Sequence, residues 1–154
     1  MLEISVSDKG KETIVFLKGP IDENAGQVLA DLHSRVLKTV VFNFKEVAYI
    51  NSLGIRSWVN FLRHIQEGRE IFFEECTSDV VMQMNMMAMF RGDAVVRSFY
   101  GDYTCDNCGH EQAIRFEVTE DSDLQKDLVE QPCEKCSTIL SLDEDDENYL
   151  IFLE

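Results

Sequence analysis

Two pairs of cysteines carry the strongest chemical signal in this sequence. Each pair has the spacing Cys-x2-Cys, and 24 residues separate Cys105 and Cys108 from Cys133 and Cys136. Each tight turn can supply two thiolate donors, so the two pairs together offer the four convergent ligands that a tetrahedral divalent ion needs. The turns also have small or turn-forming neighbours, namely Gly109, Pro132 and Ser137. The pattern therefore predicts a structural zinc site.

Three other interpretations of the cysteines stay open at this point. The pairs could instead form two disulfides or serve as free thiols in a redox pair, and four thiolates also suit iron, as in a rubredoxin-type site. Residues 1–6 alternate apolar and polar side chains, unlike a signal peptide, and no apolar run reaches the length of a membrane span. We therefore expect a cytoplasmic protein with no membrane partner, and a reducing cytosol favours a metal over disulfides.

The net charge of −15 is concentrated in the C-terminal third of the chain. Residues 1–100 hold 11 basic and 13 acidic residues, a net charge of −2, whereas residues 101–154 hold 3 and 16, a net charge of −13. Four thiolates on one divalent ion would make the second part more negative still. Because phosphate would be repelled there, we expect no nucleic-acid partner.

The elements before the cysteines alternate between strand and helix patterns. Alternating or continuous apolar runs predict strands, and apolar stripes at helical spacing predict helices. The predicted strands lie at residues 2–6, 13–17, 40–44 and 71–73, and the predicted helices at residues 25–36, 52–66 and 80–90. The order β-β-α-β-α-β-α predicts an α/β (α+β) fold, a mixed sheet with helices packed on it.

The character of the chain changes near Gly92. Apolar segments at residues 95–103, 114–118 and 139–142 surround the cysteine turns, with an acidic polar segment at 119–131. Short strands around two cysteine turns describe a small, β-rich zinc ribbon, in which the metal would supply much of the folding free energy. We therefore predict two domains, residues 1–98 and residues 99–154.

A possible switch lies where the strand ending near Ile50 meets the helix that follows. Asn51 or Ser52 stands where the first helical N–H groups need a side-chain oxygen, so a helix cap is the simplest interpretation. The same position would suit a phosphoserine, since a phosphate there meets free N–H donors and the positive end of the helix dipole. Phosphorylation would add a charge of about −1.5 to −2 at one point, enough to break or remake an interface.

Residues 1 to about 98 resemble a STAS domain, the fold of bacterial anti-sigma factor antagonists. The resemblance rests on the opening hairpin, on Leu17-Lys18-Gly19-Pro20-Ile21-Asp22 before the first helix, and on Ile50-Asn51-Ser52-Leu53-Gly54 before the second. In that family the second segment usually reads Asp-Ser-Ser/Thr-Gly, and its first serine is phosphorylated. The position matches Ser52, and the glycine matches Gly54. Asn51 and Leu53 depart from the family pattern.

The resemblance implies a binding protein without catalysis of its own. Its partner would be a kinase-like anti-sigma factor, and Ser52 would be the switch. The contact surface would comprise Asn51, Ser52 and Gly54 with Arg56 and Asn60 of the second helix, helped by Asp22 and Asn24 of the preceding loop. The sequence also gives no sign of catalysis, because it contains no phosphate loop, His-Glu metal motif or nucleophile–base pair.

The sequence is also consistent with two other functions. One is a constitutive adaptor in which the acidic ribbon is the main recognition element, and the other is a cysteine-based redox sensor.

The methionines of residues 82–89 have helical spacing, which favours core packing. If part of this run is exposed, it indicates a homodimer or a partner groove, because methionine adapts to many surfaces.

Overall fold

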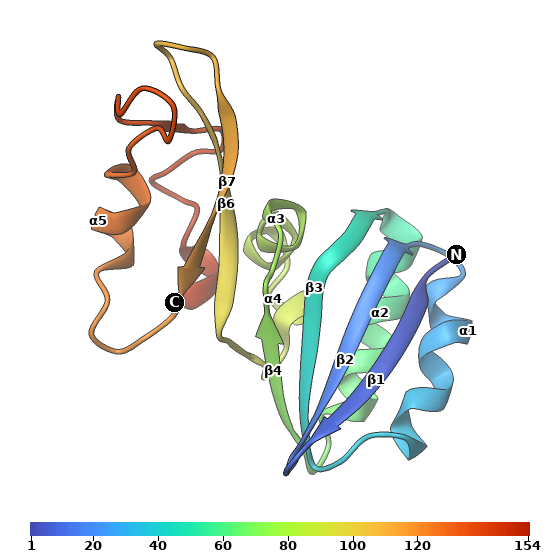
Figure 1. Ribbon diagram of the computed structural model, residues 1–154. Helices are drawn as coiled ribbons and strands as arrows, with labels where there is room; N and C mark the ends of the chain where they lie inside the picture. The colour runs from blue at the N-terminus through green and yellow to red at the C-terminus, as the bar shows by residue number, and fades with distance from the viewer.

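The computed structural model describes residues 1–154 and contains two β-sheets. The five-stranded sheet has the order β1-β2-β3-β4-β5, in which β1 and β2 form an antiparallel hairpin and the other neighbours are parallel. Its strands are β1 (Glu3–Lys9), β2 (Glu12–Ile21), β3 (Thr39–Ile50), β4 (Glu70–Glu74) and β5 (Val95–Val96). Helices α1 (Ala25–Leu29) and α2 (Ser52–Ile65) pack beside each other along this sheet (Figure 1). The predicted mixed sheet with helices is confirmed.

The three-stranded sheet contains the cysteine turns. Its order is β7-β6-β8, all antiparallel, and the chain passes from the first sheet to this one at Arg97. Its elements are β6 (Ser98–Thr104), β7 (Glu111–Glu117), α5 (Leu124–Val129), β8 (Ser141–Leu142) and the 3-10 helix η2 (Ile151–Leu153). Only six residues of the acidic segment at 119–131 form a helix. The first cysteine turn joins β6 to β7, whereas the second lies in a segment with only an isolated bridge between Pro132 and Ile139.

The predicted helix at residues 25–36 is shorter than expected. It consists of α1 and the 3-10 helix η1 (Ala30–Ser34), after which the chain turns toward β3. Arg69 holds this turn, because its guanidinium donates hydrogen bonds to the carbonyls of His33 (3.0 Å) and Leu37 (3.2 Å). The predicted apolar stripe is still buried at Ala25, Leu29 and Leu32.

The predicted helix at residues 80–90 is interrupted at Met87. It divides into α3 (Ser78–Met86) and α4 (Ala88–Arg91), with Met87 extended at φ −143°. Met84 and Phe90 explain the break: six residues apart on one helix they would point about 120° away from each other, yet both are buried. The interruption turns Phe90 into the core, where its carbonyl accepts a hydrogen bond from Trp58 Nε1 (2.9 Å).

One apolar core runs through both sheets. Edge-to-face aromatic contacts among Phe42, Phe44, Trp58 and Phe73 form its first half. Helix α3 lies between the two sheets and contacts both β3 and β6 (Figure 1). The C-terminal segment closes over this helix, since Asn85 Oδ1 accepts from the N–H of Phe152 (2.8 Å) and Phe152 is buried. The two sheets therefore depend on each other for burial of α3.

Candidate functional site

The four cysteines of the two predicted pairs converge on one point. The Sγ atoms of Cys105, Cys108, Cys133 and Cys136 all lie within 4.8 Å of one another. The Cys105–Cys136 and Cys108–Cys133 Sγ distances are 3.5 and 3.6 Å, so each close contact joins the two turns. Sulfurs at about 2.3 Å from a tetrahedral ion are about 3.8 Å apart, whereas a disulfide requires about 2.05 Å. The cluster fits a four-thiolate metal site.

The two cysteine turns have the same local construction. In each, the first cysteine's carbonyl accepts from the N–H four residues later, Gly109 in the first turn and Ser137 in the second, both at 2.8 Å. These two residues have φ values of 75° and 68° and reverse the chain. The left-handed conformation is natural for glycine, and Ser137 is one of the two non-glycine residues of this protein that adopt it.

The neighbours of the cluster hold the sulfurs without adding a ligand. The backbone N–H groups of Cys108 and Lys135 point to the Sγ atoms of Cys105 and Cys133, each at 3.4 Å. His110, a possible competing ligand, instead pairs with Glu134 at 2.6 Å across the two turns. Four thiolates complete a tetrahedral shell and leave no open position for a substrate.

The residues of the predicted switch gather where β3 meets α2. Asn51 is the N-cap of the helix, and its Oδ1 accepts a hydrogen bond from the N–H of Gly54 (2.8 Å). Its Nδ2 donates to the Glu23 carboxylate (3.1 Å). The pKa of this carboxyl lies below its ordinary value, mainly because the backbone N–H of Glu23 donates to it and secondly because Asn51 does. Ser52 is the first helical residue; its side chain is exposed and makes no hydrogen bond.

The remaining residues of the predicted contact surface differ in their exposure to solvent. Asp22 is buried and its carboxylate accepts from the N–H of Asn24 (2.9 Å), so it shapes the loop before α1. Gly54 is also buried, against the backbone at Ile21. Arg56 and Asn60 are exposed one and two turns after Ser52 on the same side of α2. Four-residue spacing therefore places Ser52, Arg56 and Asn60 in one exposed row.

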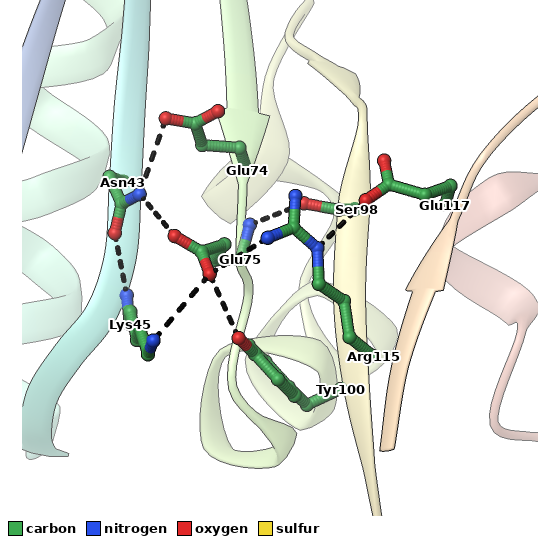
Figure 2. Close-up of polar contacts among 8 residues, drawn as sticks. All are labelled: Asn43, Lys45, Glu74, Glu75, Ser98, Tyr100, Arg115 and Glu117. Carbon is green, nitrogen blue, oxygen red and sulfur yellow. Dashed lines mark hydrogen bonds and ion pairs between the residues drawn. The ribbon is translucent and has the colours of Figure 1, made fainter. Parts of the chain in front are cut away.

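A polar cluster at the joint between the sheets was not predicted from the sequence. Glu75 follows β4 with a φ of 50°, and its carboxylate lies between residues of β3, β6 and β7 (Figure 2). It accepts hydrogen bonds from Asn43 Nδ2 (2.7 Å), Tyr100 Oη (2.8 Å) and Arg115 Nη1 (3.1 Å), while Lys45 Nζ lies 4.0 Å away. These partners are 25 to 40 residues from Glu75 along the chain, so no local sequence pattern indicates them.

The Glu75 cluster should make stability depend on acidity. Burial opposes ionisation of Glu75, but hydrogen bonds from Asn43 and Tyr100 and the charges of Arg115 and Lys45 outweigh it, so the pKa falls below the ordinary 4.5. A lowered folded-state pKa contributes stability that is fully present above pH 4.5 and lost as the pH falls through the folded value. We expect Glu75→Gln to lower the melting temperature at pH 7, and the difference from wild type to shrink toward pH 4.

The adjacent Glu74→Gln variant is the control for this prediction. Glu74 receives only the longer Asn43 hydrogen bond (3.2 Å) and lies at the same strand end. Its melting temperature should stay close to that of wild type at both pH values. If the two variants behave alike, Glu75 does not stabilise the joint through its charge.

Comparison with solved structures identifies the fold of the first part. An anti-sigma factor antagonist from Mycobacterium paratuberculosis superposes with a TM-score of 0.52 at 11% identity, covering 62% of this chain and 85% of that one. The unphosphorylated anti-sigma factor antagonist SpoIIAA gives a TM-score of 0.48 at 14% identity, covering 61% of this chain and 87% of that one. No protein-family model matches, and no curated protein matches in sequence.

The first of these likenesses shows that the chain has the fold of an anti-sigma factor antagonist, the STAS fold expected from the sequence. To this fold is added a C-terminal region whose four-cysteine cluster could hold a metal ion. None of the helices has both the length and the apolar character required to cross a membrane.

Proposed function

We propose that this protein is a non-enzymatic regulatory module that binds a kinase-like anti-sigma factor and is released when Ser52 is phosphorylated. The observation that carries the proposal is that Asn51 and Ser52 have different roles at the start of α2. Asn51 caps the helix, so the Ser52 hydroxyl is exposed and has no structural task. The STAS fold supports a partner of this class.

Phosphorylation at this position has a clear physical effect. The Ser52 oxygen would attack the γ-phosphorus of ATP bound to the kinase, forming the Oγ–P bond, breaking the bond to ADP and losing the hydroxyl proton. The product would place about two negative charges at the N-terminus of α2, one turn from Arg56 and close to the Glu23 carboxylate that pairs with Asn51. A partner surface that fits the neutral serine would then face a phosphate.

The C-terminal region, in this proposal, is an acidic zinc ribbon that extends the interaction surface of a STAS-like domain. Residues 1–98 and 99–154 are the two units, joined through the shared core. The site residues are the four cysteines, and zinc suits them because it accepts four thiolates in a closed tetrahedron. Iron binds the same donor set, and metal analysis of the purified protein distinguishes the two. The negative charge of this region argues against a nucleic-acid partner.

The test of the switch is transfer of phosphate from radiolabelled ATP by a kinase-type anti-sigma factor of the same genome. We expect Ser52 to be labelled and Ser52→Ala to lose the label. Ser57→Ala is the matched control, since Ser57 is half-buried on the same helix and should not affect labelling. Ser52→Asp should weaken partner binding about tenfold or more, because a charge is placed in the interface. Equal labelling of Ser52→Ala would refute the switch.

A constitutive adaptor is the second candidate, and the residues around Ser52 favour it. Leu53 is exposed where the family pattern has a hydroxyl residue, and Asn51 stands where it has an aspartate. An adaptor would bind its partner equally well with Ser52→Asp and would show no labelling. The redox-sensor alternative requires protein that contains no metal and forms disulfides within the cluster on mild oxidation.

A further inference from the structure

Three hollows that share lining residues lie at the joint between the two sheets and over the sheet faces beside it. The middle hollow, of about 500 Å³, lies between Lys45 of β3 and the face of β6 and β7. It shares Lys45 with a hollow of about 310 Å³ over β2 and β3, and shares Asp102 and Ala113 with one of about 350 Å³ over β6 and β7. We call the three together the inter-sheet trough. Figure 2 shows its corner, where Lys45, Glu75 and Tyr100 point toward one another.

The charge of the inter-sheet trough is strongly negative. One basic side chain lines it, that of Lys45, and the Glu75 carboxylate is already paired with Arg115 (3.1 Å) and near Lys45 (4.0 Å). The acidic side chains that line the trough are Glu46, Glu75, Asp79, Asp102, Glu111 and Asp143. The N-terminus of α3 opens into the middle hollow, but Asp79 in its first turn already meets the dipole there. The trough therefore selects a cationic ligand over an anionic one.

The shape of the inter-sheet trough suits an extended chain. Strand β4 pairs with β3 only from Thr39 to Asn43, so the rest of β3, as far as Ile50, has no strand on that side. The middle hollow runs along this free edge at Lys45 and Val47. The N–H of Lys45 already donates to Asn43 Oδ1 (3.0 Å), but no strand pairs with the residues that follow on this side, and an added extended segment could do so.

We propose that the inter-sheet trough binds an extended segment of a partner protein that carries lysine or arginine at alternate positions. Basic side chains would point to the acidic wall of β6 and β7, and the small apolar side chains between them, which point the opposite way, would lie over Val47. This site goes beyond the proposed function, because it contains none of the residues of the Ser52 surface. It assigns a binding role to the joint that the added C-terminal region creates with the STAS fold.

The experiment measures the fluorescence anisotropy of a labelled peptide of alternating lysine and valine with the full-length, metal-loaded protein. A peptide of alternating glutamate and valine is the negative probe. We expect the basic peptide to bind and its affinity to fall with added salt. The Asp79→Asn/Asp102→Asn variant should bind about tenfold more weakly, since two ion pairs are lost. Asparagine at position 102 can still accept the hydrogen bond from Ser78, so the fold is preserved.

Two further variants separate the trough from general attraction of charges. Glu120→Gln/Asp121→Asn removes the same net charge from an exposed loop outside the trough and should bind like wild type. Ala113→Arg places a bulky cation on the wall shared by two hollows and should abolish binding. Equal weakening by the loop variant, undiminished binding by Ala113→Arg, or equal binding of the glutamate peptide would each overturn the proposal. Ser52→Asp should leave peptide binding unchanged, so the two surfaces are tested separately.

Discussion

Chelation of the bound metal is expected to unfold most of residues 99–154. Two of the four cysteines, Cys105 and Cys133, are buried, and the turn that holds Cys133 lies in a segment with only the two-residue strand β8 after it. A structural zinc site contributes about 10–16 kcal/mol at neutral pH, which matches or exceeds the whole stability of an ordinary domain, about 5–15 kcal/mol. Loss of the metal would therefore leave this region without its main source of folding free energy.

Substitution of one ligand should have the same result. We expect Cys133→Ser to reduce the metal content from about one ion per chain to none, with a partial loss of the near-ultraviolet circular dichroism signal and a loss of amide protection in β6 and β7. Because Tyr149 and Phe152 cover α3, protection should fall there as well. Cys76→Ala is the matched control: Cys76 is buried in the shared core, away from the cluster, and this variant should keep its metal. Metal-free protein with unchanged melting would contradict the structural role.

The second large effect is expected from Gly54→Ala. A Cβ atom at Gly54 would lie 1.8 Å from the carbonyl oxygen of Ile21 and 2.3 Å from its carbon, so the end of β2 and the start of α2 would have to separate. Alanine favours helix over glycine by about 1 kcal/mol, but steric overlap with the backbone outweighs this gain. We expect a net loss of about 3 kcal/mol in the free energy of unfolding, measured by urea titration.

Gly26→Ala is the matched control for this prediction. Gly26 lies in α1, and an added Cβ would meet nothing closer than the Ser57 hydroxyl at 3.6 Å. Its stability should equal or exceed that of wild type. If Gly54→Ala is as stable as Gly26→Ala, the close approach of α2 to β2 is wrong. The contact also means that weaker partner binding by a Gly54 variant must be corrected for unfolding before it is assigned to the interface.

Local signals in the sequence predicted the parts of the structure that depend on local geometry. The cysteine spacing was sufficient for the four-sulfur cluster, because each pair carries its own turn. The start of α2 at Ser52 followed from the cap position and the apolar stripe that Trp58, Leu62 and Ile65 continue. Both are decided within a few residues of chain.

Features that depend on distant contacts were not predictable in this way. The break at Met87 arises because Met84 and Phe90 must both enter the core, and helical spacing alone favoured an unbroken helix. Of the methionines there, Met84 is buried while Met86 and Met89 are 75% and 54% exposed. The Glu75 cluster unites four strands, and its members look like ordinary surface residues in the sequence.

The position of α3 beneath the C-terminal segment has a consequence for synthesis of the protein. Asn85 and Phe152, which are hydrogen-bonded in the finished molecule, are 67 residues apart. At about 5–20 residues per second, a ribosome adds the second about 3 to 13 s after the first. During that interval the apolar side of α3 that the last residues cover has no permanent neighbour. Nascent chains should therefore bind chaperones through this helix, and release should follow once Phe152 has emerged.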